Sequence, residues 1–412
     1  MEPPVTVLGA GIVGICTALA LVERGFSVRV VDRTAPGQET SYGNAGVISP
    51  WSVVPQAMPG TWRQIPKLMF GTHKPLSVHP RVWLRMIPWG VSLLKKGAEQ
   101  QVRDTSEAMS TLCAPSIDIY QRYLSDAGAT HLIKSSIYVH AYRDGSKASL
   151  DTLDAQIRRE KGAEMEVIGV DALHRLEPYL NRSFKGAVLI KGQARAISPG
   201  EICTALADLA QARGVAFVTR NVRSLERRSE GWSVICDTDR FPAKAVVIAM
   251  GVWSRELLRS LGVSVPLMAE RGYHVEYPDP QIMTENSIMD TDAKVIASSM
   301  AGGLRVAGQA EFAPIDAPPN ESKIARLHNV ARAMFPDLRA EQKKSWMGRR
   351  PSFPDSLPAL GPVDGHEGLF ANFGHSHYGL MMAPKSGQIV AAQLARDTQN
   401  KDLSAFSLAR FQ

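Results

Sequence analysis

Three glycines near the start of the chain have the spacing of a nucleotide-binding turn. Gly9, Gly11 and Gly14 form the pattern G-x-G-x-x-G, and Asp32 follows 23 residues after the first of them. In a dinucleotide site the glycines permit a tight turn, close approach of the pyrophosphate, and close packing of helix on strand. The carboxylate of Asp32 would accept a hydrogen bond from a ribose hydroxyl and would repel a 2′-phosphate. The pattern therefore favours FAD or NAD over NADP, without separating the first two.

Two pairs of neighbouring residues later in the chain could contact a charged substrate. The guanidinium of Arg349 or Arg350 can hold a carboxylate through two parallel charge-assisted hydrogen bonds. Tyr273 and His274 lie on an expected strand and could supply polar contacts. Because neighbours on a strand point to opposite faces, only one residue of each pair is expected to face a site.

The elements around the glycine turn form a βαβ unit. Residues 5–9 form a short apolar run and residues 27–32 alternate between apolar and polar, both typical of strands, and residues 14–23 between them are helix formers. A second helix should open at Ser198, because the sequence Ser-Pro-Gly-Glu has capping-box spacing with Pro at the first helical position. We expect this helix to reach about Arg213.

Further strands and one helix are expected to complete a nucleotide-binding sheet. The expected strands are residues 215–219, a hairpin-like pair at 222–226 and 232–236, and residues 245–249 and 369–373, with a helix over 379–395. The cofactor domain is therefore expected to be discontinuous.

Two insertions have a different character. Residues 50–88 are rich in Pro, Trp and Met, which predicts a long ordered loop, whereas residues 272–306 contain several short strands. The predicted fold class is α/β, or α+β overall: a Rossmann-type nucleotide-binding domain with an inserted mixed or antiparallel-sheet substrate domain. We assign residues 1–51, 144–261 and 346–412 to the first domain, and residues 52–143 and 262–345 to the second.

Composition excludes several classes of protein. The chain has 412 residues, of which 44% are hydrophobic and 21% charged, as in ordinary globular enzymes. Its net charge of +7 comes from scattered Lys and Arg, so no nucleic-acid partner is expected. The four cysteines have no metal-ligand spacing, and no metal is expected. Without a signal-like start or a spanning segment, we expect a cytoplasmic protein.

Four separated motifs carry a resemblance to a known family. They are Ser-Tyr-Gly-Asn-Ala-Gly at 41–46, Ala-Met-Gly-Val-Trp-Ser at 249–254, Gly-Arg-Arg-Pro at 348–351 and Gly-His-Ser-His-Tyr-Gly at 374–379. In this order they resemble the D-amino-acid oxidase and glycine oxidase superfamily, most closely its bacterial D-amino-acid dehydrogenases. The resemblance implies that the nucleotide-binding domain binds FAD.

The resemblance also implies which residues contact the cofactor. The expected FAD-binding residues are Gly9, Gly11, Ile12, Val13, Gly14, Asp32, Arg33, Ser41, Asn44, Ala45, Gly46, Val47, Ile48, Val222, Ala249, Gly251, Trp253, Gly374, His377, Tyr378, Gly379, Leu380 and Met381. Asn44 stands where some relatives attach the flavin through histidine, and no cysteine lies beside the Arg-Pro pair. Binding should therefore be non-covalent.

The implied reaction is oxidative deamination of a small amino acid, with the D-enantiomer favoured. By resemblance, Arg350 holds the substrate carboxylate, Tyr273 is preferred over His274 for a polar contact, and a hydride passes to flavin N5. The imine product then hydrolyses to a 2-oxo acid.

Three alternatives stay open at this stage. The substrate could be a secondary amine of the hydroxyproline, sarcosine or opine type, and the chain could be a subunit of a larger flavin complex. Residues 83–96 could contact the inner face of a membrane, although Pro88 interrupts their amphipathic pattern and favours a packed helix. The electron acceptor could be a quinone, a carrier protein or oxygen.

Overall fold

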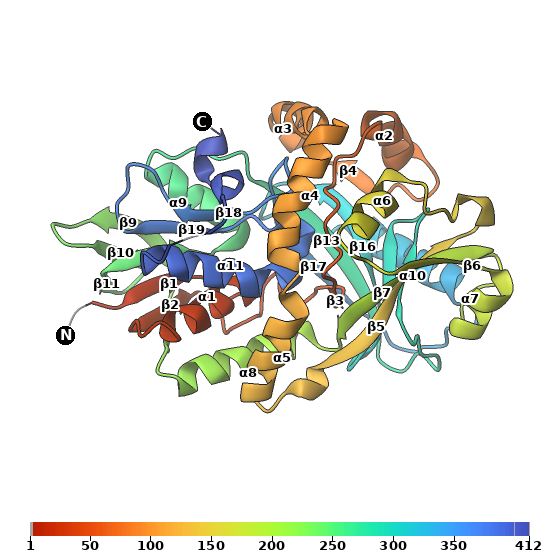
Figure 1. The fold of residues 1–412 in the computed structure, drawn as a ribbon, viewed down its shortest axis with the longest axis horizontal. Coiled ribbons are helices and arrows are strands. Elements are labelled where there is room, and N and C mark those ends of the chain that lie inside the picture. Colours follow the sequence, from red (N-terminus) through yellow and green to blue (C-terminus); the bar gives the residue numbers. More distant parts are fainter. Residues whose placement is uncertain (1–2, 399, 412) are drawn as a thin grey trace.

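A six-stranded, mainly parallel sheet forms one end of the elongated molecule in the computed structural model, which describes residues 3–398 and 400–411 (Figure 1). The βαβ unit predicted from the glycine turn is present at its centre, where β1 pairs in parallel with β2. The strands lie in the order β18 (Ala359–Pro362), β19 (Leu369–Phe373), β12 (Ala245–Ile248), β1 (Val5–Leu8), β2 (Val28–Asp32) and β8 (Ala216–Thr219).

Helices cover one face of this sheet and share one apolar core with it. They are α1 (Ile12–Val22), α4 (Glu99–Cys113), α5 (Ser116–Asp126), α8 (Pro199–Ala212) and α11 (Gly379–Leu394). The predicted cap of α8 is present, because Ser198 Oγ accepts a hydrogen bond from the Glu201 amide at 3.4 Å. Helices α1 and α11 touch so closely that a Cβ on Gly387 would lie 2.8 Å from the backbone of Cys16.

The predicted hairpin forms a separate antiparallel sheet instead of extending the nucleotide-binding sheet. Its strands are β9 (Val222–Arg227), β10 (Trp232–Cys236) and β11 (Arg240–Ala243). Apolar side chains such as Trp232 and Val234 share a core with Leu8, Val31 and the short helix α9 (Ser254–Ser260). The hairpin therefore buries its apolar side against the nucleotide-binding sheet. If its strands had instead extended the edge of that sheet, this apolar side would not pack on it.

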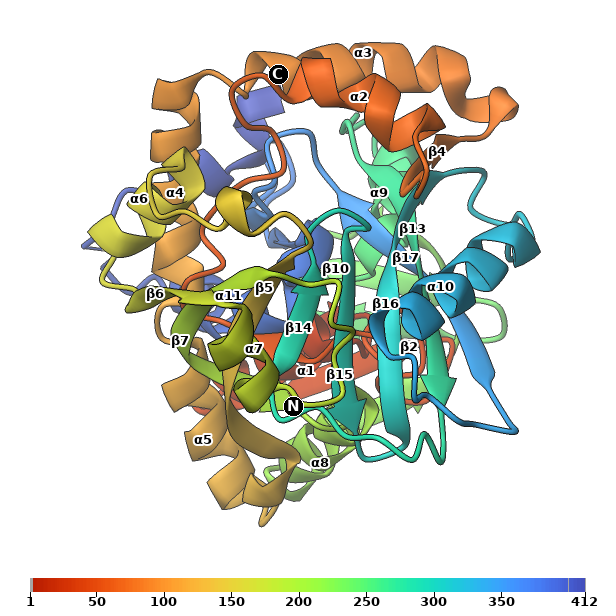
Figure 2. The same cartoon turned by 90° about the vertical axis from the view of Figure 1, so that its right-hand side faces the viewer.

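A ten-stranded mixed sheet forms the other half of the molecule (Figure 2). Helix α10 (Glu321–Met334) packs its apolar side chains on one face of this sheet, against Val275 and Tyr277. Two shorter helices, α6 (Leu153–Glu160) and α7 (Val170–Leu176), belong to the same half. The main path of the sheet is β17 (Lys344–Ser352), β13 (Met268–Tyr277), β16 (Gly303–Phe312), β15 (Val295–Met300), β14 (Ser287–Asp290), β5 (Ile133–Tyr142), β7 (Gly186–Ala196) and β3 (Val47–Ile48), with β4 (Leu76–Val78) beside β16 and β6 (Met165–Gly169) beside β7.

The domain boundaries expected from the sequence need correction in three places. Strands β6 and β7 fall within residues 144–261, which were assigned to the cofactor domain, yet they pair in the large sheet. Strand β17 also lies in the large sheet, although most of it follows the expected boundary at 346. Conversely, α4 and α5 fall within residues 52–143 and pack on the nucleotide-binding sheet. Strand and helix partners are set by long-range packing, which local pattern does not reveal.

The expected loop over residues 50–88 contains regular structure, so that prediction was wrong. Helix α2 (Thr61–Phe70) includes Pro66, and α3 (Trp83–Lys95) includes Pro88. One internal proline costs about 3 kcal/mol in a helix, and α2 buries no side chain while α3 buries only Trp89, so burial within the chain does not explain why both helices form. Both helices lie on the same side of the molecule, at the top of Figures 1 and 2. Across residues 3–398 and 400–411, no helix has both the length and the apolar character that spanning a bilayer requires.

Candidate active site

A cavity of about 1710 Å³ lies where the two large sheets meet. On one side it is lined by the glycine turn after β1, the end of β2 and the loop before α11. On the other side it is lined by residues of β13, β16 and β17. Loops at the carboxyl ends of parallel strands are the usual binding edge of such a sheet, and the cavity occupies that edge.

Most residues expected to bind the cofactor border this cavity. They are Gly9, Gly11, Ile12, Val13, Asp32, Arg33, Ser41, Asn44, Ala45, Val47, Val222, Ala249, Gly251, Trp253, Gly374, His377, Tyr378, Gly379, Leu380 and Met381. Three others, Gly14, Gly46 and Ile48, are not among its lining residues. Gly14 and Gly46 instead permit close packing, because a Cβ would lie 1.9 Å from the Gly9 carbonyl oxygen and 2.5 Å from that of Ala196.

The glycine turn has the shape that a dinucleotide requires. Gly9 has a φ of +106°, a conformation that L side chains rarely adopt. Gly11 borders the cavity at the start of α1, where a side chain would fill the space that a phosphate approaches. The carboxylate of Asp32 closes the turn, since its Oδ2 accepts from the Ala10 amide at 2.6 Å. These residues fit the pyrophosphate and ribose of a dinucleotide.

The loop 41–46 is held against the cavity by groups from the large sheet. Gly43 lies under the Trp346 ring, and a Cβ there would be 2.0 Å from ring atoms. Arg305 donates to the Asn44 carbonyl at 2.8 Å and is ion-paired with buried Glu276 at 2.7 Å. A side chain at position 43 would collide with the Trp346 ring, which explains the glycine there.

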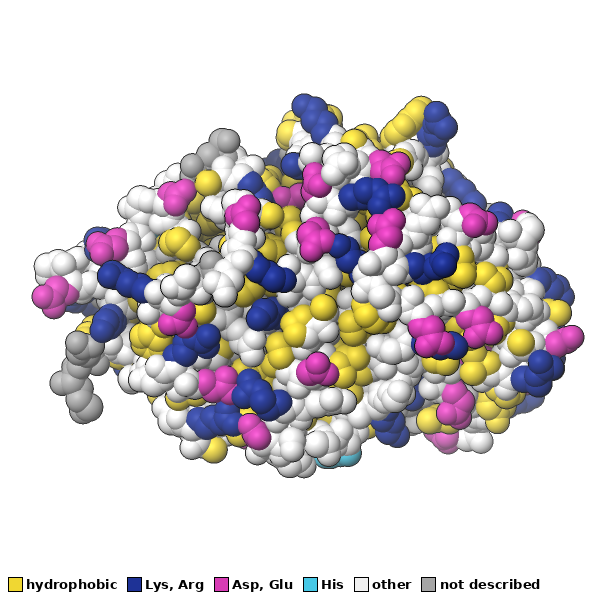
Figure 3. Space-filling model, viewed as in Figure 1, with side chains coloured by type: hydrophobic (Ala, Val, Ile, Leu, Met, Phe, Trp, Pro, Cys, Tyr) yellow, Lys and Arg dark blue, Asp and Glu magenta, His cyan; other side chains and the backbone are white. Residues whose placement is uncertain are grey.

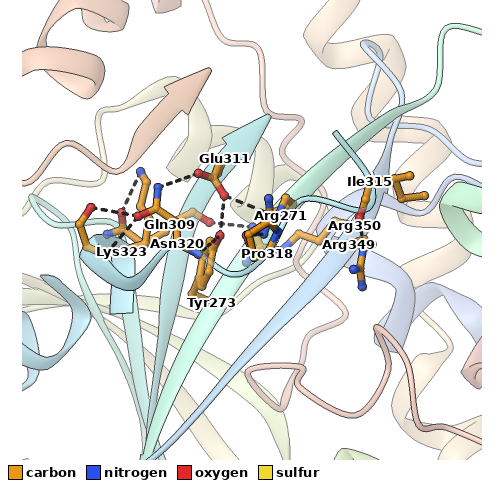
Figure 4. Close-up of polar contacts among 11 residues, drawn as sticks. Arg271, Tyr273, Gln309, Glu311, Ile315, Pro318, Asn320, Lys323, Arg349 and Arg350 are labelled. Carbon is orange, nitrogen blue, oxygen red and sulfur yellow. Dashed lines mark hydrogen bonds and ion pairs between the residues drawn. The ribbon is translucent and has the colours of Figure 1, made fainter. Parts of the chain in front are cut away.

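Arg350 faces the cavity and Arg349 does not. Both lie on β17, where alternation sends their side chains to opposite faces. The Arg349 guanidinium donates through Nε to the Ile315 carbonyl at 2.7 Å, as Figure 4 shows. The Arg350 guanidinium lies across Gly272, where a Cβ would be 2.1 Å from Nη2. Its Nη1 donates to the Gln309 carbonyl at 2.9 Å.

Arg350 is paired with a buried glutamate that the sequence analysis missed. Its Nη1 lies 3.1 Å from Oε1 of Glu270, and His377 Nε2 lies 2.6 Å from the same oxygen. Ser352 donates to the other carboxylate oxygen at 2.9 Å. Burial alone would raise the pKa of Glu270, but His377, Arg350 and Ser352 outweigh it and lower the pKa to about 2. Glu270 is therefore ionised at neutral pH.

One local signal could have suggested this position. Strand alternation places Glu270 and Gly272 on the same face of β13. Because Gly272 has no side chain, it leaves space on that face, next to the glutamate. Its partner, however, comes from the register between β13 and β17, in which Glu270 lies directly opposite Arg350. That register connects residues 80 positions apart and is not visible in the sequence.

Tyr273, the preferred residue of the pair on this strand, borders the cavity, whereas His274 is not among its lining residues. The Tyr273 hydroxyl donates to Glu311 and accepts from the Asn320 amide at 3.2 Å, as Figure 4 shows. Although Tyr273 borders the cavity, its ring belongs to the core beneath α10. Alternation was the right rule, but the odd-numbered face of β13 is the one that α10 covers.

His274 faces the cofactor loop instead of a substrate, and this corrects its expected catalytic role. Its Nδ1 donates to the Gly43 carbonyl at 3.1 Å, and its ring stacks on Trp346 with centroids 5.2 Å apart. Burial, together with the positive charge of Arg305, lowers the pKa of His274 to about 3. The neutral imidazole therefore supports the loop 41–46.

The loop before α11 brings two further side chains to the cavity. Gly374 adopts a φ of +89°, and a Cβ there would lie 2.2 Å from the Phe353 ring. The Tyr378 hydroxyl donates to the Val54 carbonyl at 2.9 Å, while His377 reaches Glu270. His375 also borders the cavity, but its ring is engaged by the Ser386 hydroxyl, 3.1 Å from its Nε2. The positive end of α11 therefore begins beside the Arg350–Glu270 pair.

The glycine turn at the edge of a parallel sheet, facing a mixed second sheet across the cavity, defines a two-part dinucleotide-binding fold. The FAD dependent oxidoreductase family matches residues 4–393, so the chain belongs to this family and uses FAD. Relatives include a D-amino-acid oxidase of Bradyrhizobium diazoefficiens, 32% identical over 99% of this chain and 98% of the relative. A D-amino acid dehydrogenase of Rhodopseudomonas palustris is 30% identical over the same shares.

Solved structures share the fold at lower identity. Glycine oxidase from Geobacillus kaustophilus has a TM-score of 0.76 and 21% identity, covering 99% of this chain and 98% of its own. Iminodiacetate oxidase from Chelativorans has a TM-score of 0.74 and 19% identity, covering 98% of each chain. The family predicted from the four motifs is therefore confirmed.

Proposed function

We propose that the protein oxidises the amine of a small amino acid, with D-enantiomers favoured, and that the imine hydrolyses to the 2-oxo acid. The observation that carries this proposal is the placement of Arg350 on the cavity-facing side of β17, beside the loop that begins α11. The names of the two relatives, a D-amino-acid oxidase and a D-amino acid dehydrogenase, support the same substrate class.

Arg350 would bind the substrate carboxylate and orient the α-carbon. Its Nη1 is engaged by Glu270 and the Gln309 carbonyl, which leaves Nε and Nη2 for a carboxylate. FAD, when bound, supplies the acceptor for the two electrons. The glycine turn, Asp32 and the loop 41–46 would hold it, and position 44 of that loop is an asparagine, which cannot form the histidine attachment of some relatives. Positioning and exclusion of water would supply most of the rate.

Anaerobic reduction of the purified yellow protein tests this function. A panel of D- and L-amino acids and of secondary amines such as hydroxyproline, sarcosine and opines should show which compounds bleach the flavin. Bleaching by a primary D-amino acid supports the proposal. Bleaching by secondary amines alone would move the substrate class to the alternative, and no bleaching by any amine would refute it.

Replacing Arg350 with Ala tests the residue that carries the proposal. Loss of the carboxylate clamp should raise KM about 10²-fold while the flavin spectrum is retained. Arg349→Ala is the matched control, because its side chain is on the opposite face of β17 and bonds the Ile315 carbonyl. If the two variants have the same KM, the assignment of Arg350 is wrong.

We also propose a peripheral contact between helices α2 and α3 and an anionic lipid surface. Most of the large hydrophobic side chains that are exposed in the described part of the chain lie on these two helices. They are Trp62, Phe70, Trp83, Leu84, Ile87, Val91 and Leu94, which we term the α2–α3 surface. Figure 3 shows hydrophobic and basic side chains projecting from this upper edge of the molecule. An exposed apolar group of this kind favours an interaction site.

Charge supports lipid as the occupant of the α2–α3 surface. Residues 40–98 contain seven Lys and Arg and no Asp or Glu, while the remaining chain has equal numbers of basic and acidic residues. Basic residues are scattered along the chain, but acidic residues balance them in the rest of the chain and are absent from residues 40–98, the segment that carries the exposed apolar side chains. Apolar side chains with adjacent basic residues are typical of helices that lie on anionic bilayers.

A further inference from the structure

The Glu270 carboxylate has a partner that itself reaches the cavity. Glu270 is almost fully buried, and its Oε1 is shared by Arg350 and His377. The His377 side chain is 40% exposed and borders the cavity. A buried carboxylate that holds a more exposed imidazole is the usual arrangement for orienting a histidine that transfers protons.

The hydrogen bond to Glu270 also determines which nitrogen of His377 is available. Because an ionised carboxylate only accepts, Nε2 must carry a hydrogen and donate it to Oε1 across the 2.6 Å contact. In the neutral ring the lone pair is therefore on Nδ1. No hydrogen bond within the described residues involves that atom, so it is available to a group inside the cavity.

The other titratable groups nearby are unsuited to accept a proton. Burial raises the pKa of Tyr378 well above its usual range, and its hydroxyl donates to a backbone carbonyl. Burial lowers the pKa of His375 to about 3, and the ring contacts Ser386. Arg350 has no lone pair to offer. His377 is therefore the residue beside Arg350 with both access and a free acceptor.

We propose that His377 Nδ1 removes a proton from the ammonium group of the bound substrate, and that Glu270 positions the ring for this step. This inference rests on the proposed amine oxidation. An N–H bond of the ammonium breaks, its proton forms the Nδ1–H bond, and the electron pair stays on the substrate nitrogen. The neutral amine is then the species that can be oxidised. The imidazolium is stabilised by Glu270 and returns its proton to solvent through its exposed edge.

The pairing of opposite charges also specifies the substrate class. Arg350 offers a cation to the substrate carboxylate, while Glu270 and His377 offer a carboxylate-backed acceptor to its ammonium. A zwitterionic α-amino acid satisfies both, whereas a 2-hydroxy acid lacks the group that His377 would deprotonate. Primary and secondary ammonium groups would both fit, because each has a proton to give.

The pH dependence of kcat/KM for His377→Asn tests the role of the base. At pH 7 we expect kcat/KM to fall about 10²-fold, because the substrate must then lose its ammonium proton to water. As the pH rises through the ionisation of the free amino acid, the variant should approach the wild-type value. Arg350, Glu270 and Tyr378 also face His377, but they remain unchanged in this variant. His131→Asn, at an exposed histidine, should keep the wild-type profile.

A parallel loss at every pH would mean that His377 has only a structural role, and the proposal would fail. Glu270→Gln keeps an acceptor for Nε2–H but removes the charge that stabilises the imidazolium. We expect it to lower kcat more than it raises KM, with Glu270→Asp recovering part of kcat. An effect of Glu270→Gln on KM alone would assign Glu270 to Arg350 and overturn its part in proton transfer.

A measurement without turnover separates this inference from the proposed function. The probe is 2-aminoisobutyrate, an amino acid without an α-hydrogen, added to protein labelled with ¹⁵N-histidine. Its binding should convert the His377 signal, assigned with His377→Asn, from a neutral ring to an imidazolium, whereas isobutyrate should not. An unchanged signal with bound probe overturns the inference even if amines reduce the flavin. Failure of every amine to reduce the flavin overturns the proposed function instead.

Discussion

At the level of single residues, the site is organised around an ion pair that exists before any substrate binds. Glu270 occupies Nη1 of Arg350 and is itself held by Ser352 and His377. Breaking a buried pair by removing one partner costs several kcal/mol, because the other charge is then left uncompensated. Glu270 therefore keeps Arg350 in place on the cavity wall. The negative carboxylate also offsets part of the positive charge that Arg350 offers to a substrate.

Acid stability should report on this carboxylate. The pKa of Glu270 in the folded protein is about 2, against an ordinary value of 4.5. The ionised group therefore stabilises the fold above pH 4.5, and this contribution is lost as the pH falls toward 2. Unfolding of wild type and Glu270→Gln should differ by about 3 kcal/mol more at pH 6 than near pH 2.

Thermal unfolding across this pH range is the measurement, with Glu230→Gln, at an exposed position, as the control. The control should shift equally little at every pH. A wild-type advantage over Glu270→Gln that does not shrink in acid would show that the Glu270 carboxylate is not strongly stabilised in the folded protein.

At the level of elements, strand β13 sets the geometry of the clamp. Gly272 lies directly opposite Gly348 of β17, and Glu270 lies opposite Arg350. Because Gly272 has no side chain, the Arg350 guanidinium can lie flat over the strand beside Glu270. A glycine in the interior of a strand usually marks such a close approach.

Replacing Gly272 with Ala should therefore impair substrate binding more than stability. The new Cβ would lie 2.1 Å from Arg350 Nη2, so the flexible arginine must shift, and Glu270 would still keep Ser352 and His377 as partners. We expect KM to rise at least tenfold, with a melting temperature close to wild type. Gly169→Ala is the control, because no atom lies within 4 Å of its Cβ position on β6. A wild-type KM for Gly272→Ala would mean that the position of Arg350 over this glycine is unimportant.

Elements whose signals are local could be predicted from the sequence, and those that depend on distant partners could not. The glycine turn and the Ser198 cap are contained within a few residues, so the βαβ unit and α8 were predicted correctly. The ion pair of Glu270 depends on the register between two strands 80 residues apart, and it was missed. For Tyr273, alternation was known, but the face covered by α10 was not.

At the level of the whole molecule, the excess of positive charge and most of the exposed large apolar side chains lie on the same side of the protein. Helices α2 and α3 carry the α2–α3 surface, and side chains from both helices also line the cavity. A bilayer under these helices would therefore lie beside the cavity that holds the active site. The rest of the chain has balanced charge and gives no reason for a second anionic partner.

Binding to lipid vesicles should follow from this asymmetry. Leu84 and Ile87 are 85% and 56% exposed on α3, and Arg85 lies between them in the sequence. We expect the protein to sediment with vesicles of equal phosphatidylglycerol and phosphatidylcholine, and to be released by 0.5 M NaCl, because each basic residue near an anionic surface contributes about 1 kcal/mol. Replacing both Leu84 and Ile87 with Glu should weaken binding at least tenfold.

The control is Val167→Glu, which introduces a glutamate at an exposed apolar position on β6, away from α2 and α3, and is compared with each single variant, Leu84→Glu and Ile87→Glu. It should bind the anionic vesicles like wild type, since it leaves α2 and α3 unchanged. Equal sedimentation with vesicles of pure phosphatidylcholine, or equal losses of vesicle binding in Val167→Glu and in the single α3 variants, would indicate nonspecific adsorption of the protein to lipid. In that case the basic residues of segment 40–98 would need another explanation, because charge alone would not direct these helices to a membrane.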